Sequence, residues 1–565
     1  MTTILRNPLI FGWLWLVQAL TFSGASGLCP PANDETRHLL QAVHVEVPPI
    51  VDGFLEPEIW ATAPAATRFI QRQPDEGKPA TEDTEVRILY TSDHLYIGVM
   101  CFDSEPDKII DHIKERDSTD IYENDHIRIM LDTFHDRRNG YVFVTNPQGA
   151  QLDIQVRKEG RREGGRGISN PNINTDWKAV WNVRTAILPD GWSAEIAIPL
   201  SNLRFNENSG DVWGLNIMRN IRRKNEESTW APLPRNLGFE KISLAGTLTG
   251  LEMMKKGLNL QVKPFALAGR IQNNDPEDRP SGISTLDAGL DIKYGLTSTL
   301  TADITVNTDF SQVEADDQQI NLTRFSLFYP EKRDFFLENA AMFSIGSPDD
   351  AMIFFSRRIG LSEDGDEIPL IGGVKVAGRA GRFSLGMINI QTGAKGDVPS
   401  NNYSVFRVSR DILDQSSVGL LMTNRQASVS GDYGRTLSLD GDFILSPNLS
   451  LDGYLALTSS PDMNTRNTAA KLGFYWISDN WDFNGSVFSI EDNFNADMGF
   501  GLFLMSLIQW NSTTGEIDTN LRFNFIYRPG SDIYVVYDER RPVEGLAQGI
   551  RDRSLAVKFN YLFNF

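Results

Sequence analysis

Cysteine is nearly absent from the 565-residue chain, which has only Cys29 and Cys101. Two cysteines cannot build a disulfide scaffold or a cysteine-based zinc site. Cys101 follows an apolar run at 95–100, so we expect a buried strand residue. The six histidines lack the His-Glu-x-x-His spacing of zinc enzymes. We therefore expect no metal and no cofactor.

Positive charge is also scarce, because 54 Lys and Arg face 74 Asp and Glu, a net charge of −20. Nucleic-acid binding needs a basic surface, so we expect no nucleic-acid partner. The hydrophobic share of 41% excludes wholesale disorder. With 46 glycines and 10% aromatic residues, the composition favours β structure over helices.

Long apolar runs are missing after residue 22, so no membrane-spanning helix is predicted there. The run at 9–22 follows Arg6 and precedes small residues at 23–27, which is typical of a signal peptide over 1–27. A lipid-attachment cysteine would follow a small residue, whereas Leu28 precedes Cys29. We expect an exported protein without lipidation, with a linker at 28–44.

Residues 45–250 have the pattern of a soluble β-sandwich. Short apolar or alternating segments, such as 84–90, 94–102 and 126–132, are separated by turn residues. Four tryptophans are assigned to packing: Trp60, Trp181, Trp192 and Trp213. The Arg- and Gly-rich stretch 157–167 has no strand pattern. It is interpreted as a solvated loop, with contact to anionic glycan or lipopolysaccharide phosphates as the alternative.

From 258 to 565 the segments become longer and alternate between apolar and polar residues, which predicts an antiparallel transmembrane β-barrel. Roughly 14 to 18 such segments occur, and bacterial barrels prefer an even number. Turns are predicted at 447–448, 478–480 and 529–532. The final strand ends on Phe565, which resembles the signal read by barrel assembly machinery. The alternative is an array of soluble sandwiches with one wet face per sheet.

Two family resemblances follow from particular motifs. The N-terminal region, about 45–250, resembles the family 9 carbohydrate-binding module through its motifs at 51–53, 58–60, 95–97 and 125–132. The region from 258 onwards resembles the outer-membrane barrel domain of unknown function 5916, through motifs at 309–316, 321–325, 330–333, 335–339 and 355–360. After 494–500 that family continues through further strands, whereas this chain passes almost directly to 507–512. The resemblance therefore implies a shortened barrel.

The first resemblance implies a sugar site made from an aromatic clamp. Tyr122 occupies the position of one clamp residue, just before the turn that opens the strand at 126–132. A group that binds sugar hydroxyls falls near Arg128, where the resemblance would place a carboxylate. The second clamp aromatic belongs after Trp230, where only Phe239 is found. A scaffold role for these aromatics is the alternative, since most tryptophans in sandwiches lie in the core.

The block 322–339 has neither a regular strand pattern nor a regular helix pattern. Exposing its charged residues to lipid would cost free energy. We hypothesise that it folds inwards as a plug or constriction. Five cations would then set the charge of the lumen: Arg324, Lys332, Arg333, Arg357 and Arg358. The alternative is a periplasmic or surface loop. An acidic stretch at 362–367 has calcium-type donors but does not match an EF-hand loop.

Together these features predict a non-enzymatic outer-membrane protein in glycan binding, uptake or carbohydrate catabolism, with its N-terminal module in the periplasm. Its expected partners are a glycan or oligosaccharide, outer-membrane lipid and the barrel assembly machinery. No catalytic residue is identified, because no nucleophile elbow, phosphate loop or dinucleotide motif is found. One alternative is a membrane-anchored glycoside hydrolase with a pair of carboxylates. Another is a purely structural barrel.

Overall fold

The computed structural model describes most of the chain from residue 38 to residue 559. The segments outside the description are 162–169, 171, 176, 206–211, 253, 255–259, 272–282, 298, 309–330, 332, 348–350, 362–367, 414, 447, 462–466, 478–480, 492, 502–507, 512–515, 529–530 and 543–551. For 265–287, 477–482 and everything from 500 onwards, only the backbone is described. The predicted signal peptide at 1–27 and the terminal Phe565 therefore lie outside the described residues.

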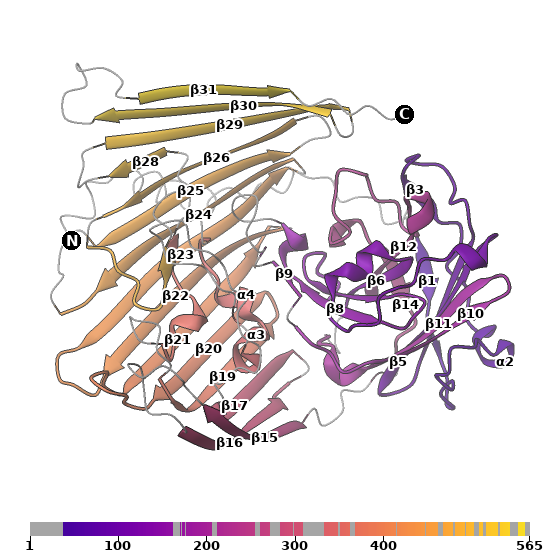
Figure 1. The fold of residues 1–565 in the computed structure, drawn as a ribbon, viewed down its shortest axis with the longest axis horizontal. Coiled ribbons are helices and arrows are strands. Elements are labelled where there is room, and N and C mark those ends of the chain that lie inside the picture. Colours follow the sequence, from indigo (N-terminus) through magenta and orange to yellow (C-terminus); the bar gives the residue numbers. More distant parts are fainter. Residues whose placement is uncertain are drawn as a thin grey trace.

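The N-terminal module, residues 38–251, is a sandwich of two β-sheets, as predicted (Figure 1). In strand order, the larger sheet contains β1 (Leu39–Gln41), β14 (Gly246–Thr249), β12 (Trp213–Ile221), β6 (His126–Asp132), β7 (Gly140–Thr145), β8 (Gln151–Val156) and β9 (Ile173–Asn174), with β13 (Glu226–Thr229) and β3 (Ile70–Gln73) joined at β12. The smaller sheet contains β10 (Asn182–Leu188), β11 (Gly191–Pro199), β5 (His94–Phe102), β4 (Thr84–Tyr90) and β2 (Val43–His44). β1 and β2 fall inside the stretch 28–44 assigned to a linker, so the sandwich includes its last residues.

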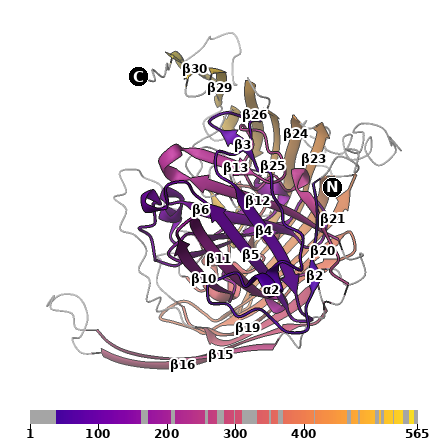
Figure 2. The same cartoon turned by 90° about the vertical axis from the view of Figure 1, so that its right-hand side faces the viewer.

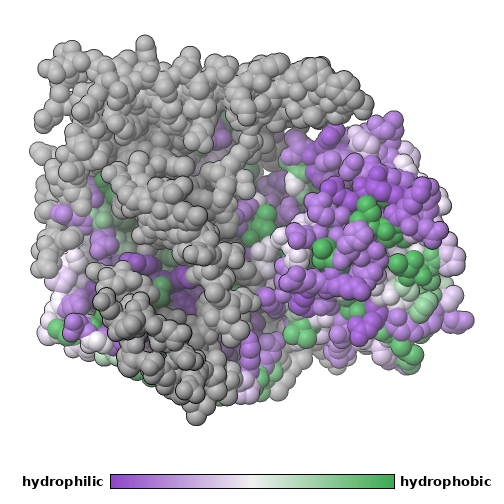
Figure 3. Space-filling view, viewed as in Figure 1, coloured by the Kyte–Doolittle hydropathy of each residue, from purple (hydrophilic) through white to green (hydrophobic). Residues whose placement is uncertain are grey.

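Apolar side chains from both sheets form the module's main core. Trp181, Trp192 and Trp213 are buried in it, and Cys101 lies among them on β5. The outer face of the larger sheet carries a second apolar layer, which includes Met130, Met218, Phe239 and Ile242. Figure 3 shows that the visible face of the module is mainly hydrophilic, with scattered apolar residues. This is the pattern of a water-exposed domain.

One buried carboxylate fixes the start of the module. Glu195 on β11 accepts hydrogen bonds from the backbone N–H groups of Asp52 (2.8 Å) and Gly53 (2.9 Å). It also accepts one from Nε1 of Trp60 (2.9 Å), on the short helix α2 (Pro57–Trp60). Burial raises the pKa of Glu195, and the three donors oppose that shift. Gly53 has φ +101°, and a Cβ there would lie 2.9 Å from the Thr185 backbone. The motifs at 51–53 and 58–60 therefore meet at this carboxylate.

The C-terminal region is one strongly curved sheet of 15 strands (Figures 1 and 2). In order, the strands are β15 (Leu260–Ile271), β16 (Ile283–Gly295), β17 (Leu300–Thr308), β19 (Leu370–Ala380), β20 (Phe383–Thr392), β21 (Asn401–Ile412), β22 (Ser416–Ala427), β23 (Tyr433–Ser446), β24 (Leu449–Ser459), β25 (Thr468–Ile477), β26 (Trp481–Ile490), β28 (Ile508–Asn511), β29 (Glu516–Arg528), β30 (Ser531–Pro542) and β31 (Asp552–Phe559). Neighbours are antiparallel, apart from a short parallel contact between β26 and β28. Among the described residues, the order ends at β15 and β31 without a pairing between them. We call this sheet the barrel sheet.

The barrel sheet exposes apolar side chains on its outer face and carries many polar side chains on its inner face. On β23, Leu437 and Leu439 are 40% and 49% exposed, whereas Thr436 and Ser438 are 5% and 0% exposed. The same alternation occurs on β19, where Val374 is exposed and Lys375 is buried. A soluble sheet would bury the leucines and expose the polar residues. Strands that cross a lipid bilayer show this inverted arrangement.

A short irregular segment fills part of the space enclosed by the barrel sheet. This plug, described at 331, 333–347 and 351–361, contains α3 (Asp334–Leu337), α4 (Ala340–Phe343) and β18 (Ala351–Met352), which pairs with β27 (Phe500–Gly501). Its apolar side chains form one cluster with inward residues of the sheet, including Ile388, Ile390 and Val405. Gly386 leaves room for Phe343, since a Cβ there would lie 2.6 Å from the ring. In the described part of the chain, no helix has the length and apolarity needed to cross a bilayer.

We expect Glu195→Ala to lower the free energy of unfolding by about 3 kcal/mol, because it leaves the indole N–H of Trp60 and two backbone N–H groups without their acceptor. Denaturant unfolding of the full chain in detergent, followed by tryptophan fluorescence, measures the change. The matched control is Glu85→Ala, which removes a partly exposed ion pair with Arg87 and should have little effect. Equal destabilisation by both variants would contradict the assignment.

Candidate functional site

Tyr122 and Arg128, two of the predicted sugar-binding residues, lie together at the start of β6. The guanidinium carbon of Arg128 lies 4.2 Å from the centroid of the Tyr122 ring. Both side chains are half-buried. A flat aromatic ring beside a multi-donor guanidinium is a suitable combination for a sugar, which offers apolar ring faces and hydroxyl groups.

His126 holds Arg128 in this position. Nδ1 of the buried His126 lies 2.8 Å from the carbonyl of Asn124, so Nδ1 carries the proton. Nε2 is then free to accept a hydrogen bond from Nε of Arg128, at 3.0 Å. Burial, with the nearby charge of Arg128, lowers the pKa of His126 to about 3. The imidazole is therefore neutral at ordinary pH, which keeps its acceptor available to Arg128.

The other two predicted residues have different surroundings. Phe239 is buried in the apolar layer on the outer face of the larger sheet, and Tyr122 packs against the same layer. Trp230 is buried in the main core between the two sheets, where its ring meets His38 edge to face at 5.4 Å. The structure thus brings Tyr122, Arg128 and Phe239 to one face of the sheet and places Trp230 on the other.

A second polar assembly joins the module to the barrel sheet. Arg138 of the module donates to Asp411 at 2.7 Å and to the carbonyl of Ser416 at 3.3 Å. Arg379 of β19 donates to Asp136 of the module at 2.6 Å and also pairs with Asp411. Asp411 is therefore shared by two arginines, one from each side of the contact.

The basic loop that follows β8 extends this contact. Arg161 pairs with Asp442 of β23 at 2.7 Å, and Lys158 lies 3.4 Å from the same carboxylate. Residues 162–169 lie outside the described residues. The beginning of the stretch 157–167, interpreted from the sequence as a solvated loop, is thus a contact with the barrel sheet.

The turn between α3 and α4 is the point where module, plug and barrel sheet meet. The carboxylate of Glu338 pairs with Arg204 of the module and with Lys293 of β16. Asn174 of β9 donates to the carbonyl of Leu337 at 3.0 Å. Lys375 of β19 donates to the carbonyls of Phe335 and Glu338. The plug is therefore held from both sides at this turn.

The predicted lumen cations are dispersed. Arg324 and Lys332 lie outside the described residues. Arg333 is buried in the plug, where it pairs with Glu331 and donates to the carbonyls of Ile359 and Ser356, both at 2.8 Å. Arg357 is half-buried and Arg358 is exposed. The inward folding of the block is visible for its described residues, while a role of these cations in ion selectivity stays a prediction.

Several residues at the contact between the module, the plug and the barrel sheet could not be identified from the sequence. Arg204 and Glu338 are separated by more than a hundred positions, as are Arg138 and Asp411. No local spacing can pair residues at such separations. The predicted acidic stretch 362–367 lies outside the described residues, and the described ones contain no group of three potential metal ligands.

Comparisons with known proteins give one family match. Residues 257–371 match the family described as Domain of unknown function (DUF5916). The match runs from just before β15 to the first residues of β19 and includes the plug. No curated protein matches the chain.

Some solved structures resemble about two fifths of the chain, and others resemble most of it. A family 9 carbohydrate-binding module from Caldicellulosiruptor kristjanssonii, in complex with glucose, is 15% identical and covers 38% of this chain and 95% of its own, with a TM-score of 0.27. OccK5 (OpdH) of Pseudomonas aeruginosa is 8% identical and covers 78% of this chain and 87% of its own, with a TM-score of 0.25. A mutant of Rh. blastica porin is 9% identical and covers 77% and 98%, with a TM-score of 0.23. With scores this low, the architecture rests on the strand order and contacts described above.

We expect the protein to lose stability as the pH falls below about 6.5, the ordinary pKa of histidine. The unfolded chain takes up a proton at His126 in this range, whereas the folded chain, with its pKa near 3, does not. This contribution to stability is fully present above pH 6.5 and decreases towards pH 3. Thermal unfolding between pH 7 and pH 4 should show a shallower decrease for His126→Gln than for the native chain. The same slope in both would contradict a buried neutral imidazole.

Proposed function

We propose that this is an outer-membrane barrel protein whose periplasmic module binds a glycan at Tyr122 and Arg128. The observation that carries the proposal is the arrangement of Arg128, which stacks over the Tyr122 ring and is held through Nε by a neutral histidine. Because Tyr122 and His126 hold the Arg128 side chain in place, its terminal N–H groups have fixed directions. Preorganised donors beside an aromatic ring suit a saccharide.

The placement in a membrane is supported by the inverted barrel sheet. Large apolar residues stand exposed on strand after strand, including Phe383, Met387, Phe406, Met422 and Leu437. Polar and charged side chains lie on the inner face of the same strands, as Arg407 and Thr423 show at 6% and 5% exposure, beside the apolar residues that contact the plug. Exposed apolar area of this extent is costly in water and favourable in lipid. The expected lipid partner follows from the same surface.

The periplasmic placement of the module is supported by the turns that it contacts. Its ion pairs reach Arg379 and Asp411, which lie next to the short turns at 381–382 and 413–415. They also reach Asp442 of β23, which is paired with Ser417 just after the second turn. The opposite ends of the same strands are joined by longer connections, such as 393–400 and 460–467. Outer-membrane barrels have short turns on the periplasmic side and long loops outside.

The plug argues against a permanently open pore. Phe335, Phe343 and Phe354 pack against inward apolar residues of the barrel sheet, where a porin has a polar, water-filled interior. We infer that passage of a solute, as in glycan uptake, requires the plug to move. The alternative of a membrane-anchored hydrolase needs two carboxylates in one cleft, whereas the site at Tyr122 offers an arginine and a histidine.

We expect calorimetry on the full chain in detergent to detect binding of a soluble cello-, xylo- or malto-oligosaccharide. Tyr122→Ala should weaken the affinity roughly two- to tenfold, because stacking on an aromatic ring contributes about 0.5–1.5 kcal/mol. Arg128→Ala should weaken it similarly through lost hydroxyl contacts.

The matched control for this experiment is Phe54→Ala, which removes an aromatic residue that is 55% exposed elsewhere on the module. Its affinity should equal that of the native chain. If no oligosaccharide binds, or if the Phe54 variant loses binding as the Tyr122 variant does, the glycan proposal fails.

We expect Gly386→Leu to raise the conductance of the protein in planar bilayers severalfold over a low native value. Its side chain would occupy the space of Phe343 and displace the plug. Gly393→Leu is the matched control, since a Cβ there lies no closer than 3.7 Å to any neighbour. A high native conductance, or an unchanged conductance in the folded Gly386 variant, would contradict the plug.

A further inference from the structure

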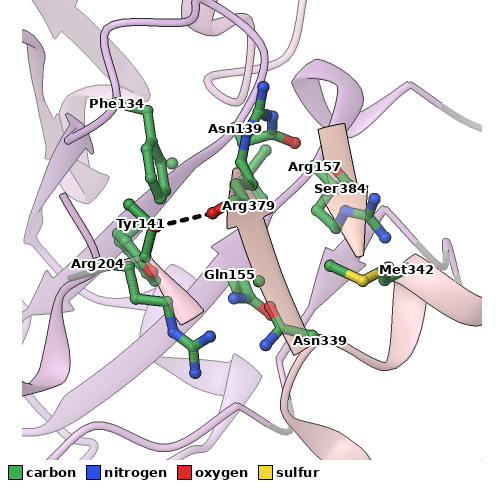
Figure 4. Close-up of a pocket in the computed structure, with 14 residues that line it drawn as sticks. Phe134, Asn139, Tyr141, Gln155, Arg157, Arg204, Asn339, Met342, Arg379 and Ser384 are labelled. Atoms are coloured by element: carbon green, nitrogen blue, oxygen red, sulfur yellow. Dashed lines mark hydrogen bonds between the residues drawn. The ribbon is translucent and has the colours of Figure 1, made fainter. Parts of the chain in front are cut away.

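A small cavity lies at the contact between the module and the barrel sheet. Its volume is about 60 Å³. The side chains around it include Phe134, Tyr141, Arg157 and Arg204 from the module, and Asn339, Met342, Arg379 and Ser384 from the plug and barrel sheet. In Figure 4, Phe134, Tyr141 and Arg204 lie on the left, and Arg157 lies on the right beside Ser384 and Met342. The cavity therefore exists only while the module is docked.

The lining of this cavity is rich in donors and contains no carboxylate. Three arginines, Arg157, Arg204 and Arg379, contribute to it in a chain with a net charge of −20. Arg204 also donates to the carbonyl of Ala377 at 3.2 Å and pairs with Glu338, while Arg379 pairs with Asp136 and Asp411. A guanidinium has five N–H groups, and these contacts engage only part of them. An anion in the cavity would meet further donors of the same groups.

Asn339 contributes a buried side-chain donor without an acceptor to this lining. Its side chain is 8% exposed, and Nδ2 has no acceptor among the described residues. In Figure 4 its amide points from the plug towards Gln155 and Arg204. A buried amide N–H group without an acceptor is destabilising, so an acceptor in the cavity would be stabilised there.

We propose that this cavity is a binding site for a small carboxylate. A carboxylate accepts from guanidinium groups in a forked geometry and can also accept from the amide of Asn339. At roughly 15 Å³ per water-sized group, the volume has room for about four non-hydrogen atoms, the size of acetate. The apolar side chains of Phe134 and Met342 leave space for a methyl group or a short chain.

The site lies between three parts of the protein, so a bound ligand would contact all of them. Arg204 and Arg157 belong to the module, Asn339 belongs to the plug and Arg379 belongs to β19. A bound carboxylate would therefore join the three parts of the protein in one hydrogen-bonded group. Because the ligand binds only the docked form, it stabilises that form by mass action.

The test is a titration of the full chain in detergent with sodium acetate, in which sodium chloride is reduced to keep the ionic strength constant. We expect the midpoint of thermal unfolding, Tm, to rise and reach a plateau. Asn339→Asp should abolish this rise, because its own carboxylate occupies the place of the anion. Aspartate tolerates the left-handed backbone of this position, φ +57°.

The matched control is Asn225→Asp, an exposed asparagine with φ +47° on the module, and it should respond to acetate as the native chain does. A second variant, Arg157→Gln, should weaken the apparent affinity for acetate at least tenfold, even if the Asn339 variant fails to fold. A parallel titration with glucuronate separates a free small acid from the acid group of a sugar. The absence of a plateau in the native chain, or an equal response of the Arg157 variant, would overturn the proposal.

Discussion

Glu338 is buried where three parts of the protein meet, and a carboxylate in such a place must be paired. Arg204 of the module and Lys293 of the barrel sheet supply its partners. Loss of either part would remove one of the cations that pair with the Glu338 carboxylate. The positions of the plug and the module are therefore linked by the same requirement. Arg204 adds to this linkage, since burial lowers its pKa and makes its own pairing necessary.

The plug itself is held mainly by side chains that reach its backbone. Lys375 donates to two of its carbonyls, and Nε of Arg407 donates to the carbonyl of Met342 at 3.1 Å. Arg407 is in turn paired with Asp440, which keeps its charge balanced inside the sheet. Short helices have few internal hydrogen bonds, so the inward cations of the strands satisfy their terminal carbonyls. Inward cations of β19 and β21 thus bind the plug, while its apolar rings fill the space between.

Strands and core residues could be predicted from local periodicity in the sequence, whereas ion pairs between distant segments could not. Alternation along strands such as β23 predicted the inverted sheet, and the tryptophan-rich segments predicted the sandwich core. The Tyr122 and Arg128 pair was accessible because Tyr122 lies just before β6 and Arg128 lies near its start. Trp230 directly follows β13, where its backbone N–H donates to the carbonyl of Ile217 and its side chain lies in the core between the sheets, which the family pattern alone could not show. The ion pairs of Asp411 and Glu338 had no signature, because their partners are brought together only by the docking of folded parts.

Strand β6 connects the proposed glycan site to the docking contact. His126 and Arg128 lie at its beginning, and Asp132 lies at its end, about 20 Å away at ~3.3 Å per residue. Asp132 accepts from the backbone N–H groups of Asp136 (3.2 Å) and Arg137 (2.7 Å), which fixes the loop that presents Asp136 to Arg379. A strand in the middle of a sheet does not bend to transmit a signal. A glycan could therefore affect the plug only by favouring one position of the whole module over another, with Arg204 and Asn174 moving as part of it. Movement of the whole module would then shift the turn at Glu338 through these contacts.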